Sequence, residues 1–469
     1  MRITHLAGTA LGTTLLLLTA VPAASAVPAA GSTAGSTAGS TAPGSGRLDR
    51  AELRGTLAAI HEAGMYGTYS SVRDGRERWT GVAGLADVDT GRKVTPDMRH
   101  RVGSISKTFT AVAVMQQVER GRIRLDAPVT RYVPELFRGT GTDVNARERG
   151  DAITVRMLLN HTSHIGDYVL GAFPSLKQNS TSSLDEGRFR SISPRELVRL
   201  GLAADATGTP GAQPGSYSNT NYVLAGLILE KVTGQKASAY ITRHVIERAG
   251  LHHTSFPRTP YIKGPHARMY ESFYGLIDPP RDYSVYDMSW ASTAGAIIST
   301  TDDLNRFYRE LLTGGLVGRA SLAEMRRTVP ILVGPESTID YGLGIYALDL
   351  PGCGRFWGHD GGVFGAGTIS FTGADGKRQL SMGYNLMKYQ RLNEEGTELE
   401  PSPIDEALII HLVKGLCPSL DTGPGSGAAL KSGIAAADAR RLLPGGLPDV
   451  GLSTGSGPPA PNRLVAPKP

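Results

Sequence analysis

The sequence predicts one α/β domain of the α+β type, in which strands from both ends of the folded region share a sheet. Strand-like alternation occurs early in the chain, over 66–72 and 78–83, and returns between 341 and 385. The region in between, about 125–285, shows helical patterns broken by long Gly- and Pro-containing loops. Flanking strands can pair across such a region if it is a helical insertion. We therefore expect the active site in the cleft between sheet and insertion.

The folded domain is expected over 48–417 of the 469-residue chain, because both ends have compositions that cannot form a core. An apolar run followed by small residues indicates a signal peptide over 1–26, and interrupting Gly and Thr residues argue against a membrane anchor. Three GSTA repeats indicate a flexible linker over 27–47. Residues 418–469, rich in Gly, Pro and Ala, are expected to be a disordered tail. The protein is therefore predicted to be secreted, with association with the cell wall left open.

The N-terminal elements follow from apolar periodicity. Residues 48–63 repeat Leu and Ile on one face, as in an amphipathic helix. Residues 108–119 are apolar almost all round, which is typical of a helix buried inside a domain, and Gly121 follows at a C-cap position. The first turn of that helix is expected to contain Ser104 and Lys107.

The later elements follow from capping and turn residues. Helices are expected over 195–203 and 221–232 inside the insertion, and over 300–312, where two Asp residues suit the N-terminal dipole. Ser402-Pro403 should start a closing helix over 404–416. An Asp-Gly turn predicts a hairpin between the last two of four C-terminal strands. These strands are expected over 341–348, 355–358, 367–371 and 379–385.

Charge and cysteine usage exclude some classes of function. The net charge of +6 and isoelectric point near 9.2 come from scattered Lys and Arg residues, which favours a solvated surface over a nucleic-acid partner. In an exported protein the isolated pair Cys353 and Cys417 is expected to form a disulfide. Metal-ligand spacing is absent, so no metal or other cofactor is predicted. The histidines interpreted as loop and turn residues are His161, His164, His252 and His253.

A Ser-x-x-Lys pattern links Ser104 to Lys107. Residues three apart share a helix face, so the amine can reach the hydroxyl, and the helix N-terminus favours developing negative charge. A serine hydroxyl is a weak nucleophile until a neighbour takes its proton. The pattern arises by chance about once in a chain of this length. A capping serine with a surface lysine is therefore the simpler alternative when the pattern stands alone.

Two further motifs change that assessment. Tyr217 and Asn219 lie in a Tyr-Ser-Asn motif just before a helix, where a phenolate could share proton transfer and the amide could orient a substrate carbonyl. His359 lies in the segment WGHDGG at the end of a predicted strand, whose glycines allow close approach of a substrate. Its imidazole could join the proton network. The Gly362 amide could pair with that of Ser104 as an oxyanion hole.

Together and in this order, the motifs resemble the serine β-lactamase and penicillin-binding-protein superfamily, in its class C β-lactamase and secreted D-alanyl-D-alanine carboxypeptidase branch. The resemblance covers 48–417 and extends to RVGS at 101–104, LLNHTS at 158–163 and SWA at 289–291. It implies a β-lactamase/transpeptidase-like fold with an antiparallel sheet flanked by helices. It also implies a DD-carboxypeptidase-like serine hydrolase that works through an acyl-enzyme.

The resemblance implies a role for each motif residue. Ser104 is acylated, Lys107 and Tyr217 handle its proton, and His359 stands where relatives carry lysine or histidine. Asn219 binds substrate. The implied partners are small peptides, amides or esters with D-amino-acid character, including peptidoglycan stem peptides and β-lactams. A monomer is expected, with no nucleic acid and no membrane bound after signal cleavage.

The sequence departs from these relatives where they hold a substrate carboxylate with arginine and threonine. Those positions carry Tyr346, Asp360 and Gly362 here. A carboxylate about 4 Å from a substrate carboxylate costs about 4 kcal/mol at a surface-like dielectric, so Asp360 argues against a strict carboxylate preference. Arg355 offsets the negative charge of Asp360 only if its side chain lies on the same face of the strand. Trp290 is expected either to line the cleft or to be a core aromatic residue.

Four functions remain open on the sequence alone. A DD-peptidase-like hydrolase is the first, and a D-aminoacyl amidase or esterase, whose substrate amine would pair with Asp360, is the second. A β-lactamase requires fast deacylation, which the motifs do not reveal. A catalytically silent penicillin- or wall-binding protein is the fourth, although the joint presence of Ser104, Lys107, Tyr217 and His359 counts against lost activity.

Overall fold

A computed structural model describes residues 48–138, 146–332, 338–393 and 399–420 of the chain. The predicted signal peptide and linker, and nearly all of the predicted tail, lie outside these residues, so those three assignments remain predictions. Within the described segments, no helix has the length and apolar character needed to cross a bilayer.

A ten-stranded sheet in the described residues organises the fold, in the order β3-β2-β1-β14-β13-β12-β11-β10-β9-β5. At its centre, β1 pairs antiparallel with β14, so that Thr68 lies opposite Tyr384. The expected pairing of N- and C-terminal strands is therefore confirmed. The strands are β1 (Gly67–Asp74), β2 (Glu77–Asp87), β3 (Arg92–Lys93), β5 (Gly215–Ser216), β9 (Val329–Leu332), β10 (Thr338–Tyr341), β11 (Tyr346–Leu350), β12 (Gly354–Val363), β13 (Ala366–Gly373) and β14 (Arg378–Tyr384).

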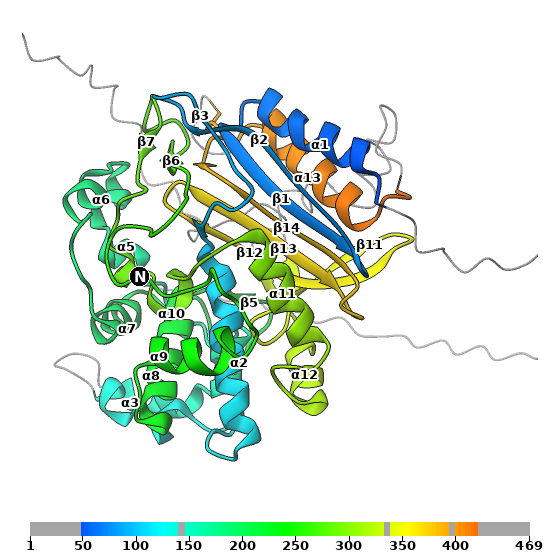
Figure 1. Cartoon of the computed structure of the whole chain (residues 1–469). Helices are drawn as coiled ribbons and strands as arrows, with labels where there is room; N and C mark the ends of the chain where they lie inside the picture. Colours follow the sequence, from blue (N-terminus) through cyan, green and yellow to red (C-terminus); the bar gives the residue numbers. More distant parts are fainter. Residues whose placement is uncertain (1–47, 139–145, 333–337, 394–398, 421–469) are drawn as a thin grey trace, which may run out of the picture. The chain divides into compact units, whose positions relative to one another are not determined.

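One face of the sheet is covered by α1 (Arg50–Glu62) and α13 (Pro403–Leu416), which lie side by side across the strands (Figure 1). Both helices begin at the residues that capping rules predict. Asp49 accepts two backbone N–H bonds at the start of α1, and Ser402 caps α13 ahead of Pro403. Their apolar faces share one core with the sheet, so the two ends of the domain stabilise each other.

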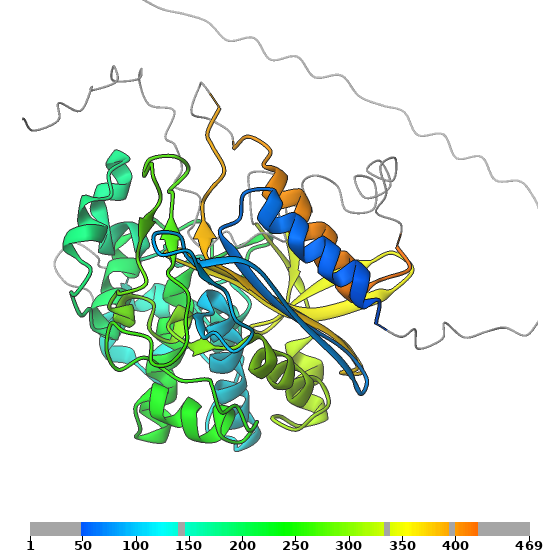
Figure 2. The same cartoon turned by 45° about the horizontal axis from the view of Figure 1, so that its top comes forward.

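The other face of the sheet packs on α11 (Thr301–Leu312) and on the turn η1 (Gly103–Ile105). The helical insertion lies on this side of the sheet (Figure 2). The central helix α2 (Ser106–Glu119) is buried on nearly every side, as its sequence predicts. The other helices are α3 (Ala146–Ala152), α4 (Val155–Leu159), α5 (Val169–Ala172), α6 (Ser182–Glu186), α7 (Pro194–Ala203), α8 (Asn219–Thr233), α9 (Ala237–Ile241), α10 (Ser292–Gly295) and α12 (Arg319–Met325). Short strands complete the fold: β4 (His100–Arg101), β6 (Tyr270–Glu271), β7 (Arg281–Asp282), β8 (Ile298–Ser299) and β15 (Leu386–Met387).

Three expectations about local structure need correction. The single strand expected over 341–348 is two strands, because the chain turns at Gly344, whose φ of +74° favours glycine. Ser104 lies in η1, immediately before α2 rather than within its first turn. His359 lies inside β12, not at the end of a strand, because the pairing of β12 with β13 continues to Val363.

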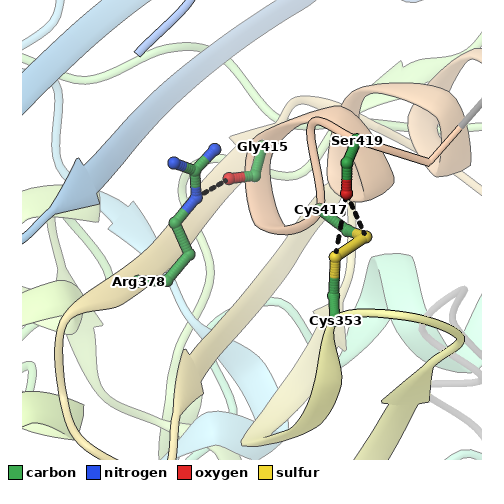
Figure 3. Close-up of a disulfide and its surroundings, with 5 residues drawn as sticks. All are labelled: Cys353, Arg378, Gly415, Cys417 and Ser419. Carbon is green, nitrogen blue, oxygen red and sulfur yellow. Dashed lines mark hydrogen bonds between the residues drawn. A yellow bond between two sulfur atoms is a disulfide. The ribbon is translucent and has the colours of Figure 1, made fainter. Parts of the chain in front are cut away.

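The predicted Cys353–Cys417 disulfide is confirmed (Figure 3). It joins the turn between β11 and β12 to the end of α13 and closes a loop of 64 residues. In the chain-entropy model, closing a loop of this length with a disulfide stabilises the fold by about 4 kcal/mol.

Replacing both cysteines by serine should therefore lower the free energy of unfolding by about 4 kcal/mol, because the unfolded chain regains its loop entropy. Chemical denaturation of the oxidised wild type and the double variant measures this difference. Reduced wild type is the matched control and should unfold like the variant. Equal midpoints for the oxidised wild type and the variant would contradict the stabilising role of the disulfide.

Candidate active site

Ser104 is held at the junction of η1 and α2, against the strand β12. Its side chain is 8 % exposed. Gly103 has φ +52° and lies so close to β12 that a Cβ there would be 2.6 Å from the Gly362 amide nitrogen. A Cβ on Gly361 would in turn lie 2.8 Å from the Ser104 amide nitrogen. The glycines thus let two backbone segments meet beside the serine.

This contact brings together the two amides that the sequence assigns to an oxyanion hole. Ser104 N and Gly362 N come from η1 and β12, whose backbones touch at this point. A carbonyl oxygen that becomes negative during attack by Ser104 is stabilised by such preorganised N–H donors. The geometry therefore supports nucleophilic attack by Ser104 on a carbonyl carbon.

Lys107 is the base nearest to the serine. Its side chain is fully buried, and Nζ lies 2.8 Å from Ser104 Oγ, 2.8 Å from Asn219 Oδ1 and 3.0 Å from the Ala294 carbonyl oxygen. Burial lowers the pKa of Lys107 to about 7. A neutral amine has two hydrogens, which it can donate to the oxygens of Asn219 and Ala294. Its one lone pair is then left to accept the proton of the Ser104 hydroxyl. Lys107 can therefore take the proton of the nucleophile near neutral pH.

Asn219, the first residue of α8, positions this lysine. Its Nδ2 donates to Asp167 Oδ2 over 2.9 Å, and its backbone N–H donates to the same oxygen over 2.6 Å. These bonds fix the amide so that Oδ1 faces Lys107. The sequence assigns substrate binding to Asn219. Among the described residues Nδ2 bonds to Asp167, which uses one of its two hydrogens and leaves the other for that role.

Asp167 is a site residue that the sequence reasoning missed. Besides holding Asn219, it accepts a 2.8 Å bond from the Val169 amide. Burial raises the pKa of this carboxyl above its ordinary value, while the bonds from Asn219 and Val169 oppose that shift. A single aspartate in a loop carries no periodicity or spacing signal, so only its position after the LLNHTS segment hinted at a role.

Tyr217 reaches the site from the edge of the sheet, where β5 pairs with β9. Its phenol faces the Ser104 hydroxyl, which favours the ionised form of the phenol, and its ring centroid lies 4.8 Å from Lys107 Nζ. Burial raises the pKa of Tyr217 well above its ordinary value. The phenolate that the sequence suggested is therefore disfavoured, and Tyr217 acts as a neutral phenol that can pass a proton.

His161 lies directly behind Tyr217, although the sequence indicated only a loop residue. The two rings stack with centroids 4.2 Å apart. Nδ1 of His161 accepts from the Ser218 amide over 3.2 Å and faces Asn221 Nδ2 at 3.1 Å. Burial and the charge of Lys107 hold the pKa of His161 well below its ordinary value. A neutral imidazole thus supports the ring of Tyr217.

His359 is buried with a neutral ring. Its Nε2 lies 2.8 Å from the Tyr341 hydroxyl, and Nδ1 donates to the backbone carbonyl of Asp360. Burial lowers the pKa of His359 to about 3, and the charge of Lys107 adds to that shift. In the described segments its hydrogen bonds run to Tyr341 and Asp360 and none to Ser104. His359 therefore organises the strand beside the nucleophile.

Asp360 is the carboxylate that the sequence singled out. Its Oδ1 accepts a 2.9 Å bond from the Tyr346 hydroxyl, and its side chain is 17 % exposed. Burial raises the pKa of Asp360 to about 6. Arg355 binds Asp349 through two bonds of 2.8 and 2.7 Å, and strand alternation places it on the opposite face from Asp360. Arg355 therefore does not compensate the charge of Asp360.

Trp290 does not line an open surface. It is 5 % exposed and packs against Phe173 and Phe364, with centroid distances of 5.3 and 4.8 Å. The sequence left two alternatives for Trp290, a cleft-lining residue or a core aromatic residue, and its burial agrees with the second. Because Phe364 directly follows β12 after Gly362 and Val363, this cluster supports the strand that carries the oxyanion amide.

Comparisons with known proteins agree with this geometry. A family model described as Beta-lactamase matches residues 53–399. The chain is 26 % identical to the putative penicillin-binding protein PbpX of Bacillus subtilis over 61 % of this chain and 63 % of that protein, less than two thirds of its length. It is 35 % identical to a D-stereospecific amidohydrolase from Streptomyces sp., with TM-score 0.66, covering 79 % of this chain and 100 % of that chain. A D-amino acid amidase from Ochrobactrum anthropi, at 23 % identity and TM-score 0.62 over 79 % and 98 % of the chains, shares the fold.

Proposed function

The chain belongs to the Beta-lactamase family, a superfamily of serine hydrolases, and from that premise we propose that it hydrolyses D-aminoacyl amides and esters. The observation that carries the proposal is the carboxylate of Asp360, which occupies a position where carboxypeptidase relatives bind a substrate carboxylate. The 35 % identity to a D-stereospecific amidohydrolase supports the same substrate class.

The net charge of the site favours a cationic substrate. Lys107 has a pKa of about 7, and His359 stays neutral because its pKa is about 3. Asp360, whose pKa is about 6, supplies a nearby negative charge. Above the pKa of Lys107 the site is therefore net negative, which attracts the ammonium group of an aminoacyl substrate and repels a terminal carboxylate.

The chemistry proceeds in two balanced steps. Lys107 takes the Ser104 proton as Oγ attacks the substrate carbonyl, and the amides of Ser104 and Gly362 stabilise the oxyanion. The bond from the carbonyl carbon to the amide nitrogen or ester oxygen then breaks, and the proton passes to the leaving group through Lys107 and Tyr217. In the second step Lys107 takes a proton from water as the water oxygen attacks the acyl carbon. The bond from that carbon to Ser104 Oγ breaks and the proton passes to Oγ, which gives the D-amino acid and restores the Ser104 hydroxyl.

Asp360→Thr tests the substrate class directly. Loss of the negative charge should lower kcat/KM for D-phenylalanine amide by about tenfold or more, the scale of one charged contact. The same change should raise cleavage of D-Ala-D-Ala peptides, because the repulsion of a carboxylate disappears. Steady-state kinetics with both substrates measures the two effects, which have opposite signs.

Asp349→Thr is the matched control, since Asp349 is exposed on the neighbouring strand and pairs with Arg355. It should change neither activity. Efficient cleavage of D-Ala-D-Ala peptides by the wild type, lost in Asp360→Thr, would support a DD-carboxypeptidase and contradict the amidase proposal.

The pH dependence should follow Lys107 and Asp360. Between pH 5 and 7 the substrate ammonium is charged, because an α-amino group titrates at about 7.7–8.0. Over this range kcat/KM should rise with pH, as Asp360 loses its proton near 6 and Lys107 near 7. Below both values the base is protonated and the ammonium partner is neutral, so activity is lost. A flat profile between pH 5 and 7 would contradict these assignments.

A further inference from the structure

A cavity of about 320 Å³ lies beside α10, the helix that contacts Lys107. Ser292, Thr293 and Ala296 form the α10 side of this cavity, whereas the Ala294 carbonyl between them accepts a bond from Lys107 Nζ. Cavities that hold small ligands begin at about 300 Å³. The volume therefore suits one small molecule.

The lining combines an apolar floor with charges of both signs. Buried side chains of Ile192, Val223, Leu227 and Met288 form the floor. Lys236 and Arg258 are exposed at the lining, and within the described segments neither has an ion-pair partner. A group placed here would therefore meet two cations that are not held in ion pairs.

The acidic residues of the lining, unlike these two cations, already accept hydrogen bonds from backbone amides. Glu230 Oε1 accepts a 2.9 Å bond from the Ala237 amide, and Asp287 Oδ1 accepts a 2.8 Å bond from the Ser289 amide. Each keeps one carboxylate oxygen outside these bonds. The lining thus has free cationic donors for a carboxylate and remaining acceptors for an ammonium group, around an apolar floor.

The wall at α10 is both strained and connected to the catalytic lysine. Ser292 starts the helix with φ +43°, a left-handed conformation that is unfavourable for a non-glycine residue. The Thr293 carbonyl accepts a 2.8 Å bond from Thr110 of α2, and the Ala294 carbonyl lies 3.0 Å from Lys107 Nζ. A ligand that moves α10 would therefore disturb the hydrogen bonds that aim the Lys107 lone pair at Ser104.

We propose that this cavity binds a hydrophobic amino acid, the product class of the reaction, and that binding slows acylation through α10. The identity of the ligand rests on the proposed function, whereas the existence of the site rests on the cavity and its charges. The carboxylate would face Lys236 and Arg258, the ammonium would face Glu230 and Asp287, and the apolar side chain would cover the floor.

Calorimetric titration of D-phenylalanine into the full-length Ser104→Ala protein tests the site without turnover. We expect the Ser104→Ala protein to bind D-phenylalanine. Its affinity should fall about tenfold when Lys236→Ala and Arg258→Ala are added, because two exposed charge contacts are lost. The matched control carries Arg76→Ala and Lys93→Ala, two exposed cations on and beside the strands β1–β3, and should bind like the parent. Thermal unfolding of each variant checks that the fold is intact.

A second arm measures inhibition of wild-type hydrolysis by D-phenylalanine. The expected pattern is a fall in kcat that the Lys236→Ala/Arg258→Ala variant resists. Absence of binding, equal binding in the double variant, or purely competitive inhibition that the double variant retains would each overturn the proposal. Charge-dependent binding by a protein that does not hydrolyse D-aminoacyl amides would contradict the proposed function and leave the second site standing.

Discussion

Ser104→Ala is expected to abolish covalent labelling and to lower kcat/KM for a D-aminoacyl amide by about 10⁴-fold or more, the scale on which serine hydrolases lose activity without their nucleophile. The reason is local. Ser104 Oγ combines contact with a buried amine and a position beside two converging backbone amides. Intact mass spectrometry with a D-aminoacyl ester or a β-lactam, followed by peptide mapping, locates the adduct.

Ser106→Ala is the matched control at the same end of α2. Ser106 Oγ accepts a 3.1 Å bond from the Ile297 amide, and Ser218 Oγ donates to the Gly166 carbonyl, so neither hydroxyl faces the base. The Ser106→Ala protein should therefore still be labelled at Ser104. An adduct on Ser106 or Ser218 would remove Ser104 from the mechanism.

Lys107→Ala and Tyr217→Phe should each slow acylation by about 10²-fold or more, the usual scale for a positioned acid or base. Lys107→Ala removes the base, whereas Tyr217→Phe removes only the hydroxyl and keeps the stacking on His161. Single-turnover measurements separate acylation from later steps.

Tyr222→Phe is the control for the tyrosine. The Tyr222 phenol donates to the Leu159 carbonyl over 2.6 Å, and its ring centroid lies 5.8 Å from Lys107 Nζ. Tyr222 is therefore a buried tyrosine near the lysine whose hydroxyl bonds away from the nucleophile. Its acylation rate should stay close to that of the wild type. Unchanged acylation in Lys107→Ala or in Tyr217→Phe would exclude that residue from proton transfer.

Sequence patterns predicted one short-range contact of the site and two long-range features of the fold. Ser104 and Lys107 meet because residues three apart share a helical face, and this holds across the junction of η1 and α2. The Cys353–Cys417 disulfide followed from two cysteines in a chain expected to be exported. The β1–β14 pairing followed from strands on both sides of a helical region.

The rest of the site depends on long-range contacts that no local pattern encodes. Asp167 meets Asn219 across 52 residues, from a loop without periodicity. Tyr341 reaches His359 only because the chain turns at Gly344 and places β10 and β12 on either side of β11. The protonation of Tyr217 follows from its packing in the site, which raises the pKa of the phenol and is a property of the fold, not of its neighbours in sequence.

The position of β1 has a consequence for synthesis of the protein. Thr68 bonds to Gly383, 315 residues later, so β1 has no C-terminal partner until most of the chain has left the ribosome. Until then one side of a largely buried strand presents free N–H and C=O groups, which invite pairing with other chains. The catalytic centre cannot be assembled on a nascent chain that lacks β12. A holding chaperone, or folding delayed until translation ends, would protect this intermediate from aggregation.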